Sequence, residues 1–134
     1  MGVITLRLTE NELSIMEVLW TSDKPLHTAG IIDLCVDKQW KSSSIHILIN
    51  SLLDKGAIVV DGFEKVGRTY SRTFSPAISK ESYMVNSLID NVQLNDSIIR
   101  EMTLALIRDD NISKETMDIL EQLIKEKKSK CEHE

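Results

Sequence analysis

Polar side chains of several kinds gather in one short stretch of this chain, at and just after the start of an apolar periodic segment. The side chains expected to face solvent in this stretch are those of Lys41, Ser42, Ser43, Ser44, His46, Ile47, Asn50 and Ser51. Serine hydroxyls bond to bases or phosphates, free amides at a helix start attract phosphate, and an isoleucine can touch a thymine methyl. These residue types therefore favour contact with nucleic acid.

Four further residues extend the candidate DNA contacts. Lys55 ends the same segment, within reach of a backbone phosphate, and Lys65 and Arg68 flank a glycine in a later turn, where cations can grip a neighbouring strand. Thr28, which begins an earlier helical segment, completes the set. Simpler interpretations stay open, because the serines are also good helix caps. His46, Lys65 and Arg68 also suit an ordinary solvated surface.

Catalytic patterns are poor in this sequence, which we interpret as that of a non-enzyme. It has no glycine-rich phosphate loop, nucleophile elbow or zinc-protease helix. Cys131 and His133 could donate to a metal, but on a terminal tail such a pair is more often accidental. We therefore expect no cofactor, and no metal site is assigned.

The polar stretch lies within a predicted order of three helices and a β-hairpin. The first helix starts at a capping box formed by Thr9 and Glu12 and ends near Trp20. The second starts with Thr28 as N-cap, and the third starts among the serines and stops at Gly56. Residues 57–60 and 68–74 read as strands around a turn at 61–67. This order predicts a mainly α fold with a small β-hairpin wing, the winged helix-turn-helix.

The second half of the chain has a different composition and predicts a helical dimerisation region. Residues 79–130 contain neither glycine nor proline, and three short amphipathic helices are expected there. Such helices can hardly bury their apolar faces alone, so pairing with a second copy is the simplest solution. The sequence thus predicts domains at 1–76 and 77–134, with dimer contacts from Leu88, Ile98, Met102, Leu106, Met117, Leu120, Leu123 and Ile124.

The net charge of −5 argues against DNA binding, but the charge is unevenly distributed. Residues 1–76 carry 8 basic and 9 acidic side chains, whereas residues 77–134 carry 8 basic and 12 acidic ones. Phosphate binding depends on the local surface, so modest non-specific affinity is expected. Neither a secretory signal nor an apolar run long enough for membrane insertion is seen in the sequence, which predicts a cytoplasmic location.

Three stretches of the sequence resemble the penicillinase-repressor family of winged-helix transcriptional regulators. They are the run Leu8–Trp20, the turn Leu52–Ile58 after the third helix, and Gly67, Arg68 and Tyr70 followed by Phe74 and Pro76. The resemblance implies a homodimeric repressor that binds double-stranded DNA at a palindromic operator. It also implies that an upstream signal, which a membrane sensor protease can relay, relieves repression.

The sequence also departs from the family at positions that bear on function. Ser43, Ser44, Ile47 and Ser51 stand where relatives commonly carry Lys-Thr, Thr and Arg, and Ala105-Leu106 aligns loosely with the Asn-Phe bond that is cut in β-lactam-responsive members. Copper-responsive members end with paired Cys-x-Cys motifs, where this chain has Cys131. An alternative hypothesis is therefore a winged-helix protein-interaction module that has lost DNA binding.

Overall fold

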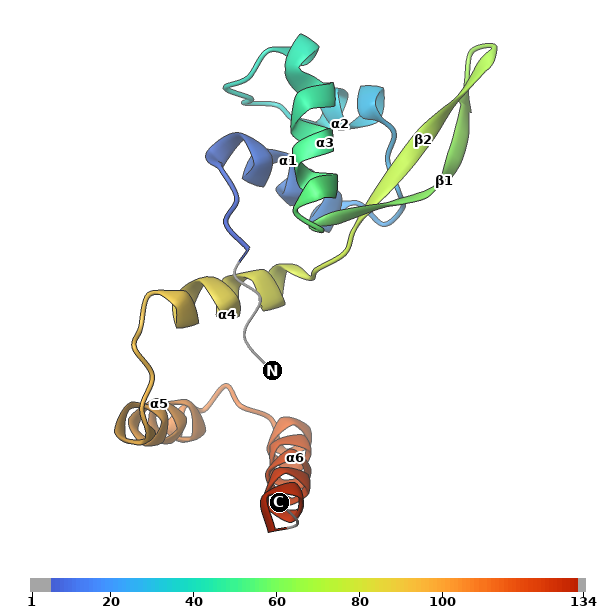
Figure 1. Ribbon diagram of the computed structural model, residues 1–134. Coiled ribbons are helices and arrows are strands. Elements are labelled where there is room, and N and C mark those ends of the chain that lie inside the picture. Colours follow the sequence, from blue (N-terminus) through green and yellow to red (C-terminus); the bar gives the residue numbers. More distant parts are fainter. Residues whose placement is uncertain (1–5, 133–134) are drawn as a thin grey trace. The chain divides into compact units, whose positions relative to one another are not determined.

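The computed structural model describes residues 6–132, so His133 lies outside the described residues. The chain forms two compact units, one reaching Val92 and the other beginning at Gln93. The first unit contains four α-helices and a β-hairpin, and the second contains two α-helices (Figure 1). The observed order confirms the predicted mainly α winged-helix fold.

Helix α1 spans Glu10–Thr21, and its start matches the predicted capping box. The Thr9 hydroxyl accepts a bond from the Glu12 amide at 3.2 Å, and the Glu12 carboxylate accepts one from the Thr9 amide at 2.9 Å. Helix α2 spans Thr28–Leu34, and its N-cap is His27. The sequence prediction that Thr28 caps α2 was therefore wrong by one position.

Helix α3 spans Ile45–Asp54 and follows a single 3₁₀ turn at Ser42–Ser44. The N-cap positions of these two elements are Lys41 and Ser44, and neither side chain makes a capping bond. The turn is held instead by the Ser44 amide, which donates to the Lys41 carbonyl at 2.8 Å. Gly56 ends α3 with a φ of +75°, the left-handed conformation predicted for it.

The wing is longer than the sequence predicts. Strand β1 spans Ile58–Val66 and pairs antiparallel with β2, Thr69–Pro76, so the predicted turn at 61–67 shrinks to Gly67 and Arg68. Gly67 has a φ of +64°, as the first central residue of a two-residue hairpin turn requires. Gly62, with a φ of +103°, lies in a bulge of β1 and does not end the strand.

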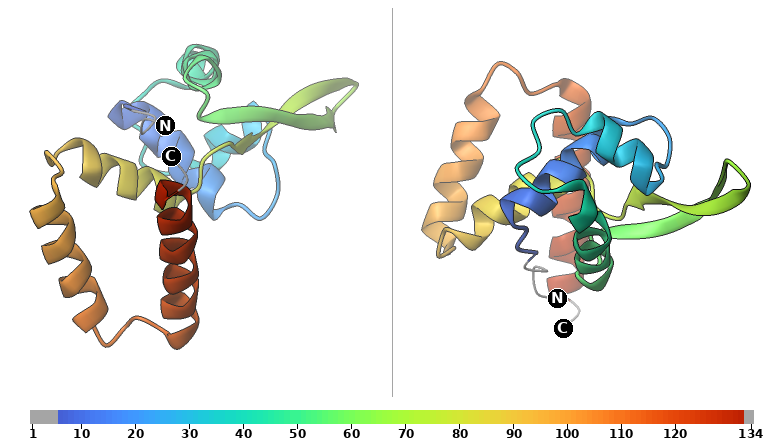
Figure 2. Two further views of the ribbon diagram at one scale, coloured as in Figure 1. Left: turned by 60° about the horizontal axis from the view of Figure 1, so that its bottom comes forward. Right: turned by 90° about the horizontal axis from the view of Figure 1, so that it is seen from above.

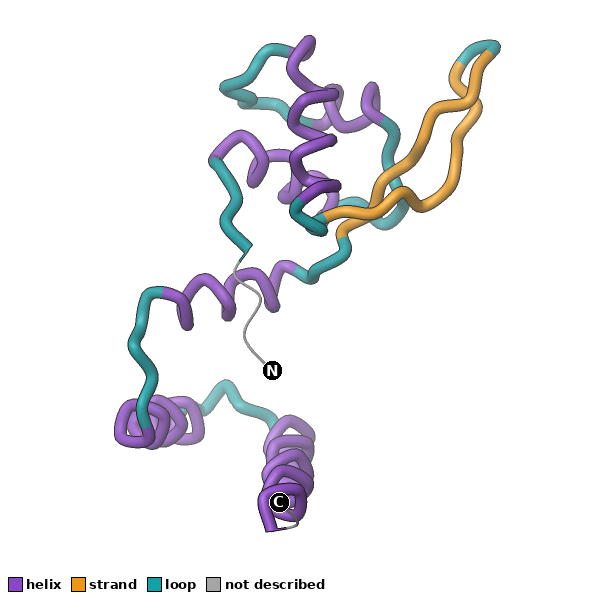
Figure 3. Tube along the Cα trace, viewed as in Figure 1, coloured by secondary structure: helices purple, strands orange, loops and turns teal. Residues whose placement is uncertain are grey.

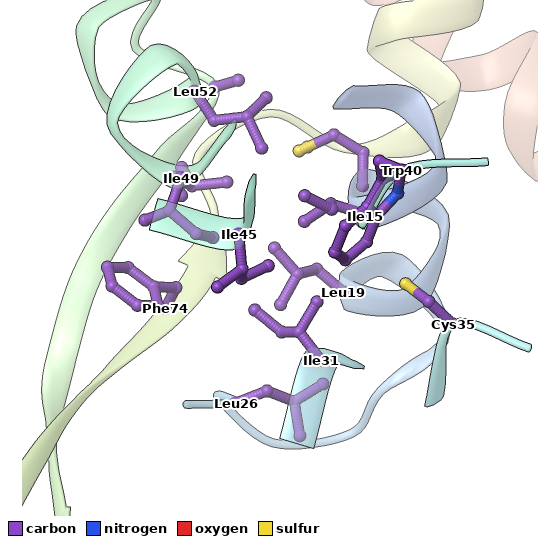
Figure 4. Close-up of a cluster of buried hydrophobic side chains, with 13 residues drawn as sticks. Ile15, Leu19, Leu26, Ile31, Cys35, Trp40, Ile45, Ile49, Leu52 and Phe74 are labelled. Atoms are coloured by element: carbon purple, nitrogen blue, oxygen red, sulfur yellow. The ribbon is translucent and has the colours of Figure 1, made fainter. Parts of the chain in front are cut away.

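The core of the first unit lies where the three helices meet the base of the hairpin. Figure 4 shows Ile15 and Leu19 of α1, Ile31 of α2 and Ile45 of α3 pointing toward one another, and the full buried set also contains Met16, Leu26, Cys35, Trp40, Ile49, Leu52, Ala57, Ile58 and Phe74. The apolar positions recur at three- and four-residue spacing along each helix, so each helix turns one face to this core. The opposite face of α3 is left exposed.

Helix α4, Lys80–Asp90, packs on the first unit. The Trp20 indole donates to the Ile78 carbonyl at 2.8 Å, its ring centre lies 5.7 Å from that of Tyr83, and the Lys80 ammonium lies 3.1 Å from the Glu17 carboxylate. The compact unit therefore reaches beyond Pro76. The assignment of all residues from 77 onward to dimerisation stays a prediction.

Helices α5 and α6 make up the second unit and span Asp96–Arg108 and Lys114–Glu132 (Figure 3). Their predicted starts are confirmed, because the Asn95 side chain accepts from the Ile98 amide at 2.9 Å and the Ser113 hydroxyl accepts from the Thr116 amide at 3.1 Å. Within residues 6–132, no helix is both long and apolar enough to cross a membrane.

Candidate nucleic-acid interface

The exposed start of α3 presents polar groups that are free to bind a ligand. Ser42 and Ser43 are exposed and Ser44 is half-buried, and their hydroxyls make no hydrogen bond to any described residue. Because none of them acts as a side-chain cap, the capping interpretation of these serines is not supported. Lys41 adds an exposed ammonium one residue earlier.

The outer face of α3 continues this surface along the helix. Ile47 is 72% exposed, and His46 and Asn50 are also exposed, while the intervening Ile45 and Ile49 are buried. Residues three and four apart share a helix face, so Ser43, Ile47 and Asn50 form one row. An amide and an apolar side chain in one row can read adenine and a thymine methyl in a major groove.

The side chains of Ser51 and Lys55 both bind Glu12 of α1. The Ser51 hydroxyl donates to one Glu12 carboxylate oxygen at 2.6 Å, and the Lys55 ammonium donates to the other at 2.6 Å and to the Arg7 carbonyl at 2.8 Å. Glu12 itself is only 2% exposed. This geometry ties the last turns of α3 to the start of α1 and does not support the two side chains as DNA contacts.

The Glu12 carboxylate carries its charge inside the protein. Burial alone would raise its pKa, but the bonds from Lys55, Ser51 and Thr9 outweigh burial and lower the pKa from 4.5 to about 2. Glu12 is thus ionised at neutral pH and holds Lys55 by charge. The capping-box pattern predicts only the local bond to Thr9, and no local pattern indicates this longer-range role.

The hairpin holds the second part of the candidate interface. Lys65 and Arg68 are both exposed, Arg68 in the terminal turn and Lys65 paired across the strands with Tyr70. In Figure 1 and both views of Figure 2, the hairpin projects beyond α1, α2 and α3. Its outer half is therefore free to reach a surface next to the one that α3 meets.

Thr28 lies at the start of α2 and is half-buried, next to a contact that links α2 to the wing. The His27 Nδ1 atom lies 2.8 Å from a Glu64 carboxylate oxygen. This contact joins residues 37 positions apart and restrains the outer half of β1. The structure thus places Thr28 next to His27, which contacts the wing. The role of Thr28 as a DNA contact stays a prediction.

The residues predicted for dimerisation lie on α4, α5 and α6, and most are uncovered within a single chain. Leu88 and Leu106 are each 65% exposed, and Ile98 is half-buried. The others with exposed side chains are Met102, Met117, Leu120, Leu123 and Ile124. A groove of about 350 Å³ between α5 and α6 is lined by three of this group, Met117, Leu120 and Ile124, together with Ile107 and the charged side chains of Glu121, Lys125 and Lys128.

The first unit has three packed helices, the third with a free polar outer face, and then a projecting hairpin with a cationic turn. These features define a winged-helix DNA-binding transcriptional regulator. The model of the penicillinase repressor family matches residues 8–126, and the chain belongs to that family. The match spans both the winged helix and the helices that follow it, which confirms the resemblance seen in the sequence.

Two known proteins resemble the chain over most of its length. The penicillinase repressor of Bacillus licheniformis is 24% identical over 125 residues, which cover 92% of this chain and 94% of that protein. A structure of Staphylococcus aureus MarR in complex with salicylate and kanamycin is 14% identical, covers 95% of this chain and 75% of that one, and has a TM-score of 0.42. A similarity at that score adds nothing to the fold described above.

Proposed function

We propose that the chain is a transcriptional repressor that binds a palindromic operator as a homodimer, with one α3 helix in the major groove of each half-site. The observation that carries this proposal is the start of α3, where serine hydroxyls lie exposed and unbonded within the described residues. A helix start of this kind can bond to base edges and phosphates at once. The cationic turn of the hairpin would then hold a flanking backbone.

The uncovered apolar side chains of α5 and α6 support the dimer. Leu106, Leu123 and Ile124 are each more than half exposed in a single chain, which is a costly arrangement in water. The same apolar side chains of a second copy would cover them through a two-fold interface. Such a dimer would present two α3 helices to half-sites about 10 bp apart, one helical turn of DNA.

An upstream signal would end repression, through a membrane sensor protease or by another route. The bond between Ala105 and Leu106, which aligns only loosely with the Asn-Phe bond cut in β-lactam-responsive relatives, lies inside α5. Proteases cut exposed, non-helical segments most readily, so cleavage here would require local opening of the helix. Relief by proteolysis is therefore coupled in this proposal to the stability of α5.

The test is the selection of binding sites from a pool of randomised duplexes by the full chain, followed by footprinting of the selected site. The expected result is a site with two-fold symmetry and two protected half-sites one helical turn apart. If the chain bound no duplex even at low salt, the proposal would be wrong. That outcome would favour the alternative of a protein-interaction module, for which the net charge of −5 is the motivation.

A further inference from the structure

The hairpin is fixed to the helices at its base. The amide of Leu26, two residues before α2, donates to the Phe74 carbonyl at 3.1 Å, and the Phe74 amide donates to the Leu26 carbonyl at 2.8 Å. Both side chains are buried in the core. Farther from the core, a bulge between Val60 and Phe63 shifts the register of β1. We call residues 63–72, which lie beyond this bulge, the outer hairpin.

A contact from α2 reaches the outer hairpin. The His27 Nδ1 atom lies 2.8 Å from a carboxylate oxygen of Glu64. His27 is the N-cap residue of α2, but its side chain makes no capping bond. Across the part of the chain that the structure describes, no other hydrogen bond, ion pair or ring contact joins the outer hairpin to a helix. The contact between His27 and Glu64 is thus the polar attachment of the outer hairpin.

The two sides of this contact differ in how firmly they are held. The His27 side chain is 19% exposed and the Glu64 side chain is 47% exposed. The imidazole ring packs against α2 at Gly30, where an added Cβ would lie 3.6 Å from two ring atoms, an ordinary van der Waals distance. Glu64 instead stands on a strand that a bulge bends, with Gly62 at a φ of +103°. The histidine is therefore the fixed partner and the carboxylate the movable one.

The contact is suited to orienting the hairpin more than to stabilising the fold. An ion pair at the surface contributes little to the free energy of folding. A neutral imidazole with its proton on Nδ1 also donates to a carboxylate, so the contact does not require a charged His27. Arg68 lies in the terminal turn, beyond Glu64. A small rotation about the bulge would therefore displace the Arg68 cation farther than it displaces Glu64.

We propose that His27 is a positioning residue, which holds Glu64 and thereby fixes the direction of the outer hairpin relative to α3. The inference rests on the proposed function, because this direction decides whether Arg68 and α3 can meet one DNA duplex at the same time. His27 acts through Glu64 and without touching DNA. When the contact is removed, the outer hairpin would rotate about the bulge, and Arg68 would no longer contribute to affinity.

The first experiment measures the direction of the outer hairpin without DNA. Residual dipolar couplings of backbone N–H groups would be recorded by NMR for the full chain as wild type, His27→Ala, Glu64→Ala and Glu64→Gln. Glu64→Gln is the matched control, because it loses the same charge as Glu64→Ala but keeps an oxygen that accepts from His27. The couplings of the outer hairpin should shrink relative to those of α1 in both alanine variants and stay as in wild type in Glu64→Gln. Equal couplings in all four proteins would overturn the proposal.

The second experiment measures what Arg68 contributes to DNA binding in each of these four backgrounds. The probe is the site selected by the full chain, with flanking base pairs on both sides. In wild type and Glu64→Gln, Arg68→Ala should weaken binding and reduce the slope of log K against log salt by about 0.9. In His27→Ala and Glu64→Ala, the same substitution should leave affinity and slope nearly unchanged. An Arg68→Ala effect of equal size in all four backgrounds would also overturn the proposal.

Two further results separate this proposal from changes in the fold and from the proposed function. Tryptophan fluorescence during heating checks each fold, since both tryptophans, Trp20 and Trp40, lie in the first unit. If His27→Ala unfolds at a lower temperature, Glu64→Ala against Glu64→Gln decides, because the Glu64 side chain is about half exposed. If the couplings change as expected but the wild type selects no DNA site, the proposed function is wrong and the orienting contact stands.

Discussion

The Lys55 ammonium and the Glu12 carboxylate lie 2.6 Å apart, nitrogen to oxygen, and join the end of α3 to the first turn of α1. Ser51 donates to the other carboxylate oxygen from the preceding turn of α3. The orientation of α3 is therefore set by a buried anion as well as by apolar packing. This arrangement separates the side chains that position α3 from those that are free to touch DNA.

Acid should destabilise the winged helix through Glu12. Its pKa is lowered in the folded state to about 2 from 4.5, so the unfolded chain takes up the proton first as the pH falls. The stabilisation, on the order of 3 kcal/mol, is complete above about pH 4.5 and is lost as the pH falls toward 2. Denaturant titrations followed by tryptophan fluorescence should show this loss in wild type. It should be absent in Glu12→Gln, which should already be less stable at pH 7, and present in the exposed control Glu10→Gln.

Lys55 and Arg68 should differ in the salt dependence of DNA binding. Lys55→Met removes a cation that Glu12 already holds, so the slope of log K against log salt should stay as in wild type, while the free energy of unfolding should fall by about 2 kcal/mol. Arg68→Ala should leave stability unchanged, weaken binding to all sequences alike and reduce the slope by about 0.9. A reduced slope in Lys55→Met, measured under conditions where that variant is folded, would show that Lys55 contacts DNA.

Ile47 and Asn50 should determine base preference. Both project from the outer face of α3, where an asparagine can bond to adenine and an isoleucine can pack on a thymine methyl. Asn50→Ala should lower discrimination at one position of each half-site by about 1–3 kcal/mol. Ile47→Ala should do the same at a neighbouring position, to a smaller degree. Repeating the site selection with each variant measures this, with Gln93→Ala as an exposed control; selected sites identical to those of wild type would contradict the assignment.

Dimerisation should require α5 and α6. Sedimentation at micromolar concentration should show a dimer for the full chain and a monomer for residues 1–92, which form one compact unit. Leu123→Glu places a charge among the uncovered apolar side chains and should dissociate the dimer. Gln122→Glu adds the same charge at the adjacent position and should not. A monomeric full chain would contradict the pairing of these helices with a second copy.

Features with a local cause could be predicted from the sequence. The capping box of Thr9 and Glu12, the glycine stop at Gly56 and the cap at Asn95 each depend on residues a few positions apart, and all three are confirmed. The wing was predicted too short because the two glycines at 62 and 67 suggest one turn. In the fold, pairing with β2 continues past Gly62, which a bulge absorbs.

What the sequence by itself determined is the order of the elements, their apolar faces and the family, because periodicity and capping are encoded over short distances. Only the tertiary structure decided which polar residues of α3 are free. Ser51 and Lys55 meet Glu12 across 39 and 43 residues of chain, a proximity that no local pattern encodes. The face of the hairpin on which Glu64 lies, toward His27, was likewise decided by strand register, which a single bulge resets.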